Sequence, residues 1–242
     1  MTRAILKRAD CAPVLLALAL CACTQNPNTL QVKYSGPYPD AHYLSEAQLD
    51  RLVRTFPPPP APGSPQEQAD LALLLELQEK RTPLQCAAAL VQEKSDFPEY
   101  FGGDANPFQK PEPKPVLDFF QKAGDDVKLA SGRLKREAKR KRPEDPRLKP
   151  CLRDVGSKYS YPSIHAAVAR AFALILSELD PALREQYLAD ADAAARNRLT
   201  AGVHYPSDVT AGEEYGARVY RELLANEAFR SELLALRHYL KK

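Results

Sequence analysis

Prolines stand where this chain can begin helices, and they constrain its fold more than any other feature. The 242 residues include 22 prolines but only 10 glycines. Proline fits the first turn of a helix, where its missing N–H is not needed, but it breaks the interior of a helix or a central strand. A capping residue followed by proline, as in Ser64-Pro65, Thr82-Pro83 and Asp180-Pro181, therefore predicts a helix start.

Apolar residues at helical spacing predict an all-α fold, a single-domain helical bundle. Such stripes follow Pro65 and Pro83, and others occupy residues 116–140, 168–179 and 223–240. A short helix is expected at 45–54, and the run from Pro57 to Pro60 predicts an extended loop after it. We find no alternating strand pattern and no internal repeat. Apolar residues make up 44% and charged residues 27%, which excludes wholesale disorder.

The N-terminus predicts an export signal. Arg3, Lys7 and Arg8 precede a short apolar core at residues 11–20, and no apolar run reaches the roughly 18 residues that span a bilayer. We expect residues 1–22 to be a signal peptide that directs the chain to the periplasm, 23–42 a polar tether and 43–242 the folded domain. The end of the signal resembles a bacterial lipobox, which makes Cys23 the expected lipidation site. Cleavage after Ala22 without a lipid is the alternative.

Export also affects the reading of the cysteines. Of five, Cys86 and Cys151 are the two that lie in the expected folded domain. In an oxidising compartment such a pair can form a disulfide. Two separate buried thiols are the alternative, and the sequence does not decide between them.

A strongly basic segment runs from Arg133 to Lys149. Most of its charges are expected on a solvated face, and the formal net charge of +3 does not favour a nucleic-acid partner. Lys135 and Arg142 are seven residues apart, about two helical turns, which predicts that they project from one side of a helix ended by Pro143. Two cations on one face can clamp an anion, and arginine supplies a planar fork.

A second segment places Ser163, Ile164 and His165 at the start of an apolar helix. The free N–H groups and the dipole of a helix N-terminus favour an anion, and histidine can carry a proton at mildly acidic pH. A serine cap beside an incidental histidine is the alternative.

The third segment holds Arg198, His204 and Asp208. A carboxylate that accepts a hydrogen bond from one imidazole nitrogen leaves a lone pair on the other, so this histidine could act as a nucleophile. Pro206 predicts a turn at this point, with a helix beginning near Ser207.

Taken together, the three segments resemble the three-part phosphatase motif of the bacterial class A non-specific acid phosphatases: Lys135-x6-Arg142-Pro143, Pro162-Ser163-Ile164-His165 and Arg198-x5-His204-x3-Asp208. That family belongs to the type 2 phosphatidic acid phosphatase and vanadium haloperoxidase superfamily. The resemblance extends to Tyr43-Leu44 and to the proline loop between Phe56 and Ser64. It covers essentially the whole chain after the signal, and it implies the helical fold of that superfamily.

The resemblance implies hydrolysis of phosphate monoesters with broad specificity and an acidic pH optimum, without cofactor or metal. In that reading His204 attacks phosphorus and forms a phosphohistidine, and Asp208 orients it. His165 protonates the leaving alcohol and then activates water. The phosphate oxygens would be bound by Lys135, Arg142, Ser163, the Ile164 amide and Arg198.

The chain departs from the family at two positions. Ile164 stands where the family usually has glycine, and Asn197 where it usually has serine. The Ile164 amide is retained, but a β-branched side chain is stiff and can crowd the pocket.

Two alternatives stay open. The first is a haloperoxidase or lipid phosphatase of the same superfamily, and the second is a non-catalytic phosphate-binding envelope protein whose pocket Ile164 closes. The expected partners are small phosphomonoesters, and a membrane through a lipid on Cys23 alone. A homo-oligomer is left open.

Overall fold

The computed structural model describes residues 39–152 and 155–241, and every regular element in these ranges is helical. The order is α1 (Glu46–Thr55), α2 (Pro65–Lys80), α3 (Pro83–Val91), α4 (Phe97–Phe101), α5 (Lys114–Ala138), α6 (Ile164–Leu179), η1 (Pro181–Leu183), α7 (Arg184–Thr200), α8 (Pro206–Leu224), α9 (Glu227–Ala235) and η2 (Leu236–Tyr239). Two isolated β-bridges occur, and the described residues form no strand. The all-α prediction is confirmed.

The N-terminal predictions lie largely outside the described residues. This holds for the signal peptide at 1–22, for Cys23 and for the tether up to residue 38. Export and lipidation therefore stay predictions. Within residues 39–152 and 155–241, no helix is both long and apolar enough to cross a membrane.

The capping signals act as predicted at the first three helices. Ser45 and Thr82 each form a capping box with the glutamine three residues later. The Ser64 hydroxyl accepts a hydrogen bond from the Glu67 amide at the start of α2. These bonds give partners to backbone amides that the helix itself leaves unpaired. Asp180 caps the 3-10 turn η1, which leads directly into α7.

Two helix boundaries differ from the prediction, and one short helix was not predicted. The helix α5 ends at Ala138, because Lys139 adopts a left-handed conformation with φ of 50°. The helix α8 begins at Pro206 rather than near Ser207, since the Asp208 carboxylate accepts a hydrogen bond from the Tyr205 amide and so closes the first turn. The five-residue helix α4 was not predicted; its aromatic residues are buried, but it is too short to show a periodic pattern.

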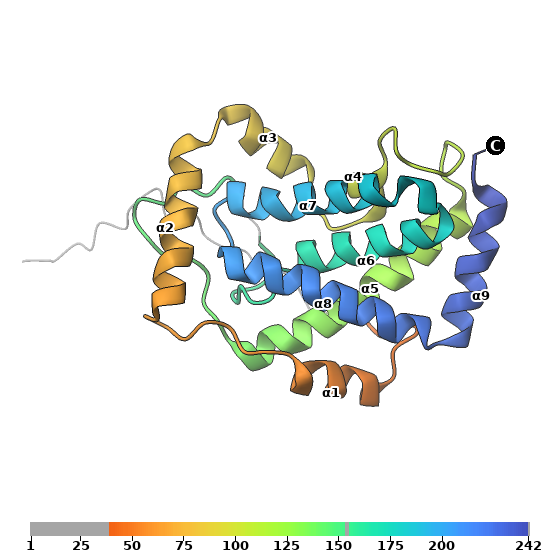
Figure 1. The fold of residues 1–242 in the computed structure, drawn as a ribbon, viewed down its shortest axis with the longest axis horizontal. Helices are drawn as coiled ribbons and strands as arrows, with labels where there is room; N and C mark the ends of the chain where they lie inside the picture. Colours follow the sequence, from red (N-terminus) through yellow and green to blue (C-terminus); the bar gives the residue numbers. More distant parts are fainter. Residues whose placement is uncertain (1–38, 153–154, 242) are drawn as a thin grey trace, which may run out of the picture. The chain divides into compact units, whose positions relative to one another are not determined.

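The central helix is α6, which packs against α5, α7 and α8 (Figure 1). Its Phe172 ring meets Phe120 of α5 edge to face, with ring centroids 5.1 Å apart. Phe97 of α4 stacks on the same Phe120 ring at 4.0 Å. These buried aromatic contacts join three helices into one core around the middle of α6.

Two glycines bring α8 close to the backbone of α6. A Cβ atom on Gly212 would lie 2.4 Å from the carbonyl oxygen of Ser163, and one on Gly216 would lie 2.2 Å from that of Ala167. Such distances exclude any larger residue unless the helices separate. The Ser163 amide donates a hydrogen bond to the Asp208 carbonyl at 2.8 Å. The second and third predicted segments are therefore joined at the backbone.

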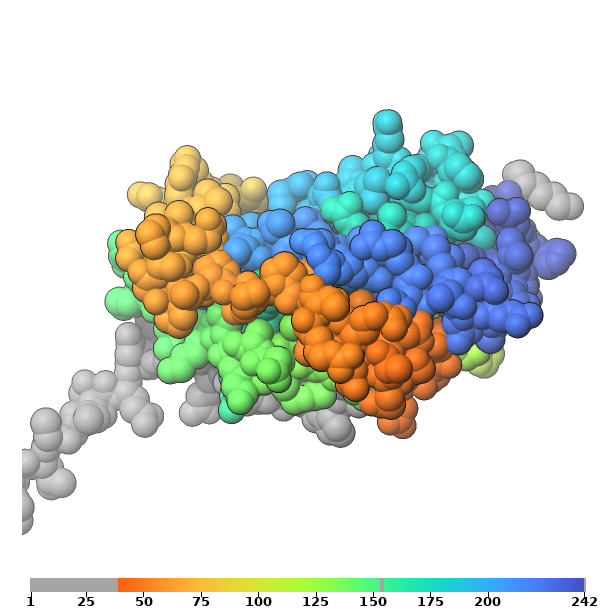
Figure 2. Space-filling model, turned by 60° about the horizontal axis from the view of Figure 1, so that its bottom comes forward, coloured from red at the N-terminus to blue at the C-terminus, as the bar shows by residue number. Residues whose placement is uncertain are grey.

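The segment from α1 to α2 lies on the surface between α8 and α5 (Figure 2). Phe56 follows α1 and packs edge to face on Tyr215 of α8, with ring centroids 4.8 Å apart. The predicted extended loop at Pro57–Pro60 comes next. The Tyr161 hydroxyl donates a hydrogen bond to the Pro57 carbonyl at 2.9 Å, which ties this loop to the chain just before Ser163.

Candidate active site

Lys135 reaches the site from the end of α5, and Arg142 reaches it from the loop that follows this helix. Lys135 lies in the last turn of α5, where its Nζ donates to the carbonyls of Tyr159 and Ser160, both at 2.8 Å. Arg142 lies beyond the end of α5, so the prediction that both project from one helix is wrong. The left-handed turn at Lys139 redirects the chain instead, and the Arg142 side chain comes close enough to Lys135 for their charges to interact.

Backbone carbonyls fix the Arg142 guanidinium. Its Nε donates to Ser157 O at 2.8 Å, Nη2 to Val155 O at 2.9 Å and Nη1 to Val203 O at 2.7 Å. Burial and the neighbouring Arg142 charge lower the pKa of Lys135 well below its usual range, while Asp208 raises it. Like charges held together in a buried place favour the binding of an anion, which would relieve their repulsion.

The start of α6 adds backbone donors. Ser163 is the N-cap, and its hydroxyl accepts from the Ala166 amide at 3.4 Å. Ile164 is the first residue of the helix, and its side chain packs partly buried against the core. The first amides of a helix have no partner within it, so the Ile164 amide and its neighbours present positive partial charge. The serine cap that the sequence analysis left open as an alternative is present, and anion binding at this helix start stays a prediction.

His204 lies between a cation and a carboxylate. Its Nε2 is 3.1 Å from Arg142 Nη1, and its Nδ1 is 3.5 Å from Asp208 Oδ2. Since the guanidinium can only donate, Nε2 must accept, and the proton belongs on Nδ1, facing Asp208. Burial, followed by the charges of Arg142 and Lys135, lowers the pKa of His204 well below its usual range. The imidazole is therefore neutral, with its lone pair toward the cations.

His165 lies in the first turn of α6, on the same side as the other site residues. Its Nε2 is 2.9 Å from the Glu93 carbonyl, so this nitrogen carries a proton. Desolvation, and then the Arg198 charge, lower the pKa of His165 well below its usual range. Both histidine pKa values fall, and the expected order, with His165 titrating above His204, stays a prediction.

Arg198 is almost fully buried in the last turn of α7. Its Nη2 donates to the Ala89 carbonyl of α3 at 2.8 Å. Its Nε is buried without a hydrogen-bond partner among the described residues. A buried donor left unpaired is costly and therefore indicates a place for a ligand oxygen. The adjacent Asn197, which replaces the usual serine, donates to the Gln92 side chain at 2.7 Å.

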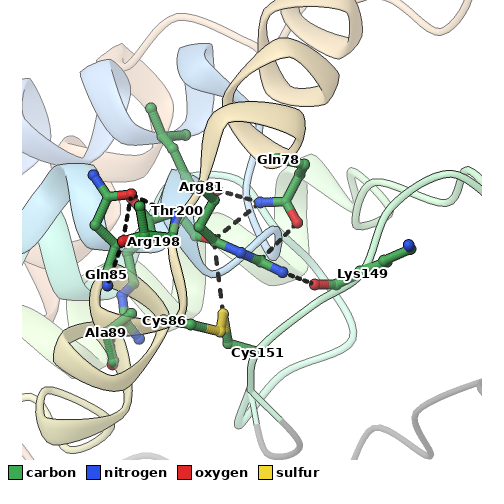
Figure 3. The surroundings of a disulfide bond; sticks show 11 residues. Gln78, Arg81, Gln85, Cys86, Ala89, Lys149, Cys151, Arg198 and Thr200 are labelled. Carbon is green, nitrogen blue, oxygen red and sulfur yellow. Dashed lines mark hydrogen bonds between the residues drawn. A yellow bond between two sulfur atoms is a disulfide. The ribbon is translucent and has the colours of Figure 1, made fainter.

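A disulfide holds α3 over this region. Cys86 of α3 is bonded to Cys151, with Cα atoms 5.8 Å apart, so the structure favours the disulfide over two separate thiols (Figure 3). The Cys151 amide donates to the Ala201 carbonyl at 3.0 Å, just past the end of α7. Figure 3 shows Arg198 beside Ala89, one turn from the disulfide. The cross-link therefore positions the helix whose Ala89 carbonyl binds Arg198.

Sequence reasoning missed Arg140 and Asp70. Arg140 belongs to the basic segment that was expected to be mostly solvated, yet it is buried and its Nη1 donates to Asp208 Oδ1 at 2.8 Å. The expectation holds for Arg147, which is largely exposed. Arg140 Nη2 donates to Asp70 of α2 at 3.2 Å. No short sequence pattern marks either residue, because Arg140 pairs with Asp70 of α2 and Asp208 of α8, which are distant from it in sequence.

The structure thus brings the three predicted segments together. Lys135, Arg142, Ser163, Ile164, His165, Arg198, His204 and Asp208 are linked by the contacts above or by direct charge interactions. Within residues 39–152 and 155–241, no group of three or more His, Cys, Asp or Glu could hold a metal ion. The arrangement can bind a tetrahedral oxyanion and present a neutral imidazole to its central atom.

Comparisons with known proteins cover the same region. Residues 108–225, which include every predicted residue of the anion and histidine site, match the model of the PAP2 superfamily. The chain is 27% identical over 240 residues to a non-specific acid phosphatase of Providencia stuartii, and the alignment covers 92% of each protein. It is 36% identical over 86 residues to a decaprenylphosphoryl-5-phosphoribose phosphatase of Mycobacterium tuberculosis, covering 36% of this chain and 47% of that one.

Among solved structures, a transmembrane PAP2 type phosphatidylglycerolphosphate phosphatase from Bacillus subtilis is similar. It has 21% sequence identity and a TM-score of 0.49, and the alignment covers 73% of this chain and 90% of that one.

Proposed function

The chain carries a PAP2 superfamily domain at residues 108–225, in agreement with the resemblance of its motif, and from this premise we propose that it is a phosphatase. Its reaction would be the hydrolysis of phosphate monoesters at acidic pH. The observation that carries the proposal is the position of His204, whose Nε2 faces Arg142 while its Nδ1 faces Asp208. The Providencia acid phosphatase, similar over nearly the whole chain, supports the same reaction class.

Substrate binding would use the charges already gathered in the site. A phosphate monoester carries negative charge on its nonbridging oxygens, and Lys135, Arg142 and Arg198 supply three cations. The buried Arg198 Nε offers a donor, and the first turn of α6 adds the Ile164 amide. Phosphoryl transfer depends mainly on positioning and on stabilising the charge of the equatorial oxygens, so these groups meet its main requirement.

The first chemical step would form a phosphohistidine. The His204 Nε2 lone pair attacks phosphorus while the bond from phosphorus to the ester oxygen breaks in line. Arg142 Nη1 lies 3.1 Å from this nitrogen in the free protein, so substrate binding must replace that contact by one from Nη1 to a phosphate oxygen. Asp208 Oδ2 lies 3.5 Å from Nδ1, which has no hydrogen-bond partner among the described residues, so a small shift would let it accept the Nδ1 proton and stabilise the positive charge that develops on the ring.

His165 would handle the protons. A proton on its ring passes to the departing alcohol oxygen in the first step. In the second step the neutral ring takes a proton from water, whose oxygen attacks phosphorus and releases His204 and inorganic phosphate. Because the pKa of His165 is lowered, its protonated form becomes populated only as the pH falls below the usual histidine range. The pKa of His204 is lowered as well, and the proposal requires it to lie below the pKa of His165, so that the nucleophile is neutral where the acid is protonated.

Hydrolysis of p-nitrophenyl phosphate tests the proposal. We expect turnover that rises toward acidic pH, persists in excess EDTA and is inhibited by vanadate, because five-coordinate vanadate mimics the transition state. His204→Ala should abolish turnover, whereas Asp208→Asn should retain part of it, since only orientation is disturbed. A folded protein that binds phosphate but hydrolyses no phosphomonoester would instead support a non-catalytic binding protein.

A lipid-linked phosphate is a second candidate substrate. The similarity to the mycobacterial decaprenylphosphoryl-5-phosphoribose phosphatase favours it, and that match spans 36% of this chain. Comparing kcat/KM for a detergent-dispersed polyprenyl phosphate with that for a short alkyl phosphate separates the two. A preference for the lipid of more than about tenfold, or 1.4 kcal/mol in transition-state binding, would reassign the substrate.

The location of the enzyme is also a proposal. The basic N-terminus, the short apolar core and Cys23 support export to the periplasm and anchoring by lipid. Metabolic labelling with a radioactive fatty acid should mark the wild-type protein and leave Cys23→Ser unlabelled. If the wild-type protein is exported but takes up no label, cleavage without lipid is the correct alternative.

A further inference from the structure

A buried arginine joins the Asp208 carboxylate to α2. The left-handed turn at Lys139 points Arg140 inward, where only 4% of its side chain is exposed. Its Nη1 donates to Asp208 Oδ1 at 2.8 Å and to the Ser207 hydroxyl at 2.7 Å. The Tyr205 ring lies under the guanidinium, with the guanidinium carbon 4.0 Å from the ring centroid. Hydrogen bonds and the ring thus fix Arg140 in one orientation.

Asp70 holds the other arm of the same guanidinium. It is a buried residue of α2, and its Oδ2 accepts from Arg140 Nη2 at 3.2 Å and from the Ser207 hydroxyl. Its Oδ1 accepts from Gln66 at 3.3 Å. Glu67 lies further out, 3.7 Å from Arg140 Nη2. Buried charge is costly unless it is paired, so this two-carboxylate arrangement around one arginine requires an explanation.

The two oxygens of Asp208 have different neighbours. Oδ1 is occupied by Arg140, whereas Oδ2 accepts from the Tyr205 amide at 2.9 Å and lies 3.5 Å from His204 Nδ1. A carboxylate held at one oxygen by a guanidinium and at the other by a backbone amide cannot rotate. Its orientation therefore determines whether Oδ2 faces the imidazole of His204.

We propose that Arg140 and Asp70 are positioning residues, which hold the Asp208 carboxylate with one oxygen turned to His204 and set how much negative charge the imidazole experiences. The proposal rests on the proposed function, because it gives this pair a part in orienting the nucleophile. Asp70 lies outside the matched PAP2 region, so α2 supports the site from the N-terminal part of the chain.

The positioning roles of Arg140 and Asp70 can be measured through the pKa of His204. The groups that face His204 are Lys135, Arg140, Arg142, Arg198, Asp208 and His165. Arg140 lowers the pKa of His204, and its removal should raise it. Asp70 partly neutralises Arg140, so its removal should strengthen the effect of Arg140 and lower the pKa of His204 further. The two halves of one ion pair therefore act in opposite directions.

The test compares Arg140→Met with Asp70→Asn, using p-nitrophenyl phosphate hydrolysis and NMR titration of the His204 ring. Both variants should lower kcat, Arg140→Met by about 10- to 100-fold, with little change in KM, because a misplaced reactive group slows the chemical step. The acid limb of kcat/KM, which reports the free enzyme, should move to higher pH in Arg140→Met and to lower pH in Asp70→Asn.

Two further variants separate positioning from folding. Arg140→Lys keeps the charge but loses the fork, so it should lower kcat and leave the His204 titration nearly in place. Arg133→Met removes a cation of α5 that binds Glu46 of α1, and it should change neither kcat nor the His204 titration.

A His204 titration that stays fixed in Arg140→Met and Asp70→Asn, or moves the same way in both, overturns the proposal. If wild-type protein hydrolyses nothing, the proposed function fails, while the NMR shifts still decide the positioning claim.

Discussion

The two nitrogens of His204 define the chemistry at the scale of single residues. Nε2 faces a guanidinium and Nδ1 faces a carboxylate, so the ring has one accepting side and one donating side. Burial keeps the pKa of this ring low, and the lone pair stays available in acidic solution. His165 differs, because its Nε2–H is held by a backbone carbonyl and, within residues 39–152 and 155–241, no carboxylate forms an ion pair with its ring.

The acid role of His165 can be tested through the leaving group. His165→Ala should slow hydrolysis of alkyl phosphates by about 10²- to 10⁴-fold, the usual contribution of a general acid, because an alkoxide leaves poorly without a proton. Hydrolysis of p-nitrophenyl phosphate should fall much less in the first step, since nitrophenolate needs little protonation. Single-turnover release of the two alcohols measures this difference. An equal loss for both leaving groups would contradict the assignment.

Ile164 is one of the two residues at which the chain departs from the motif that it resembles. Its side chain is partly buried against the core, and its amide belongs to the first turn of α6. Ile164→Gly should keep phosphate inhibition unchanged, because the amide remains, and should raise kcat/KM more for bulky phosphomonoesters than for small ones. Glycine also adds backbone freedom. A uniform fall across substrates would show instead that the loop depends on the isoleucine.

At the scale of helices, local signals predicted most starts and failed where distant residues intervene. Ser64 and Thr82 cap helices through bonds to residues three positions away, which a sequence displays directly. The first turn of α8 is different, because Asp208 both closes it and binds Arg140. The three parts of the motif lie together in the structure, although Lys135 and Arg142 do not share a helix. Arg140 and Asp70 could not be predicted, since their pairing joins α2, the end of α5 and α8.

The close approach of α6 and α8 gives a prediction at this scale. Gly212→Ala places a Cβ atom 2.4 Å from the Ser163 carbonyl, so the two helices must separate. Overpacking of this kind typically costs about 1–3 kcal/mol of stability. We expect denaturant unfolding to show that loss, and kcat to fall further than stability explains, because Ser163 and Asp208 move apart.

Gly103→Ala is the matched control for Gly212→Ala. A Cβ atom on Gly103 meets nothing within 4 Å, and this glycine does not have a positive φ. The Gly103→Ala variant should therefore have nearly the same stability and kcat as the wild-type protein. If Gly212→Ala behaves like Gly103→Ala, the contact between the two helix starts is not needed for the site.

At the scale of the described domain, the site depends on segments joined across the whole sequence. The helix α3 lies outside the matched PAP2 region, yet the Ala89 and Glu93 carbonyls in and after it bind Arg198 and His165. The Cys86–Cys151 disulfide fixes α3, and the sequence had left that pairing undecided. Thiols 65 residues apart can be paired with assurance only when the fold is known.

The double variant Cys86→Ser/Cys151→Ser tests whether the cross-link supports the site, and it leaves no unpaired thiol in the domain. The chain between the two cysteines spans 65 residues, for which the entropy of the unfolded chain predicts a loss of about 4 kcal/mol. Under conditions where the variant remains folded, we expect KM to rise, because α3 no longer holds Arg198 in place. The hydrogen bond from His165 Nε2–H to the Glu93 carbonyl, which follows α3, should weaken as well. The Nε2 proton should then exchange faster with water, which NMR can measure. A variant of lower stability with unchanged KM and unchanged His165 exchange would limit the disulfide to a stabilising role.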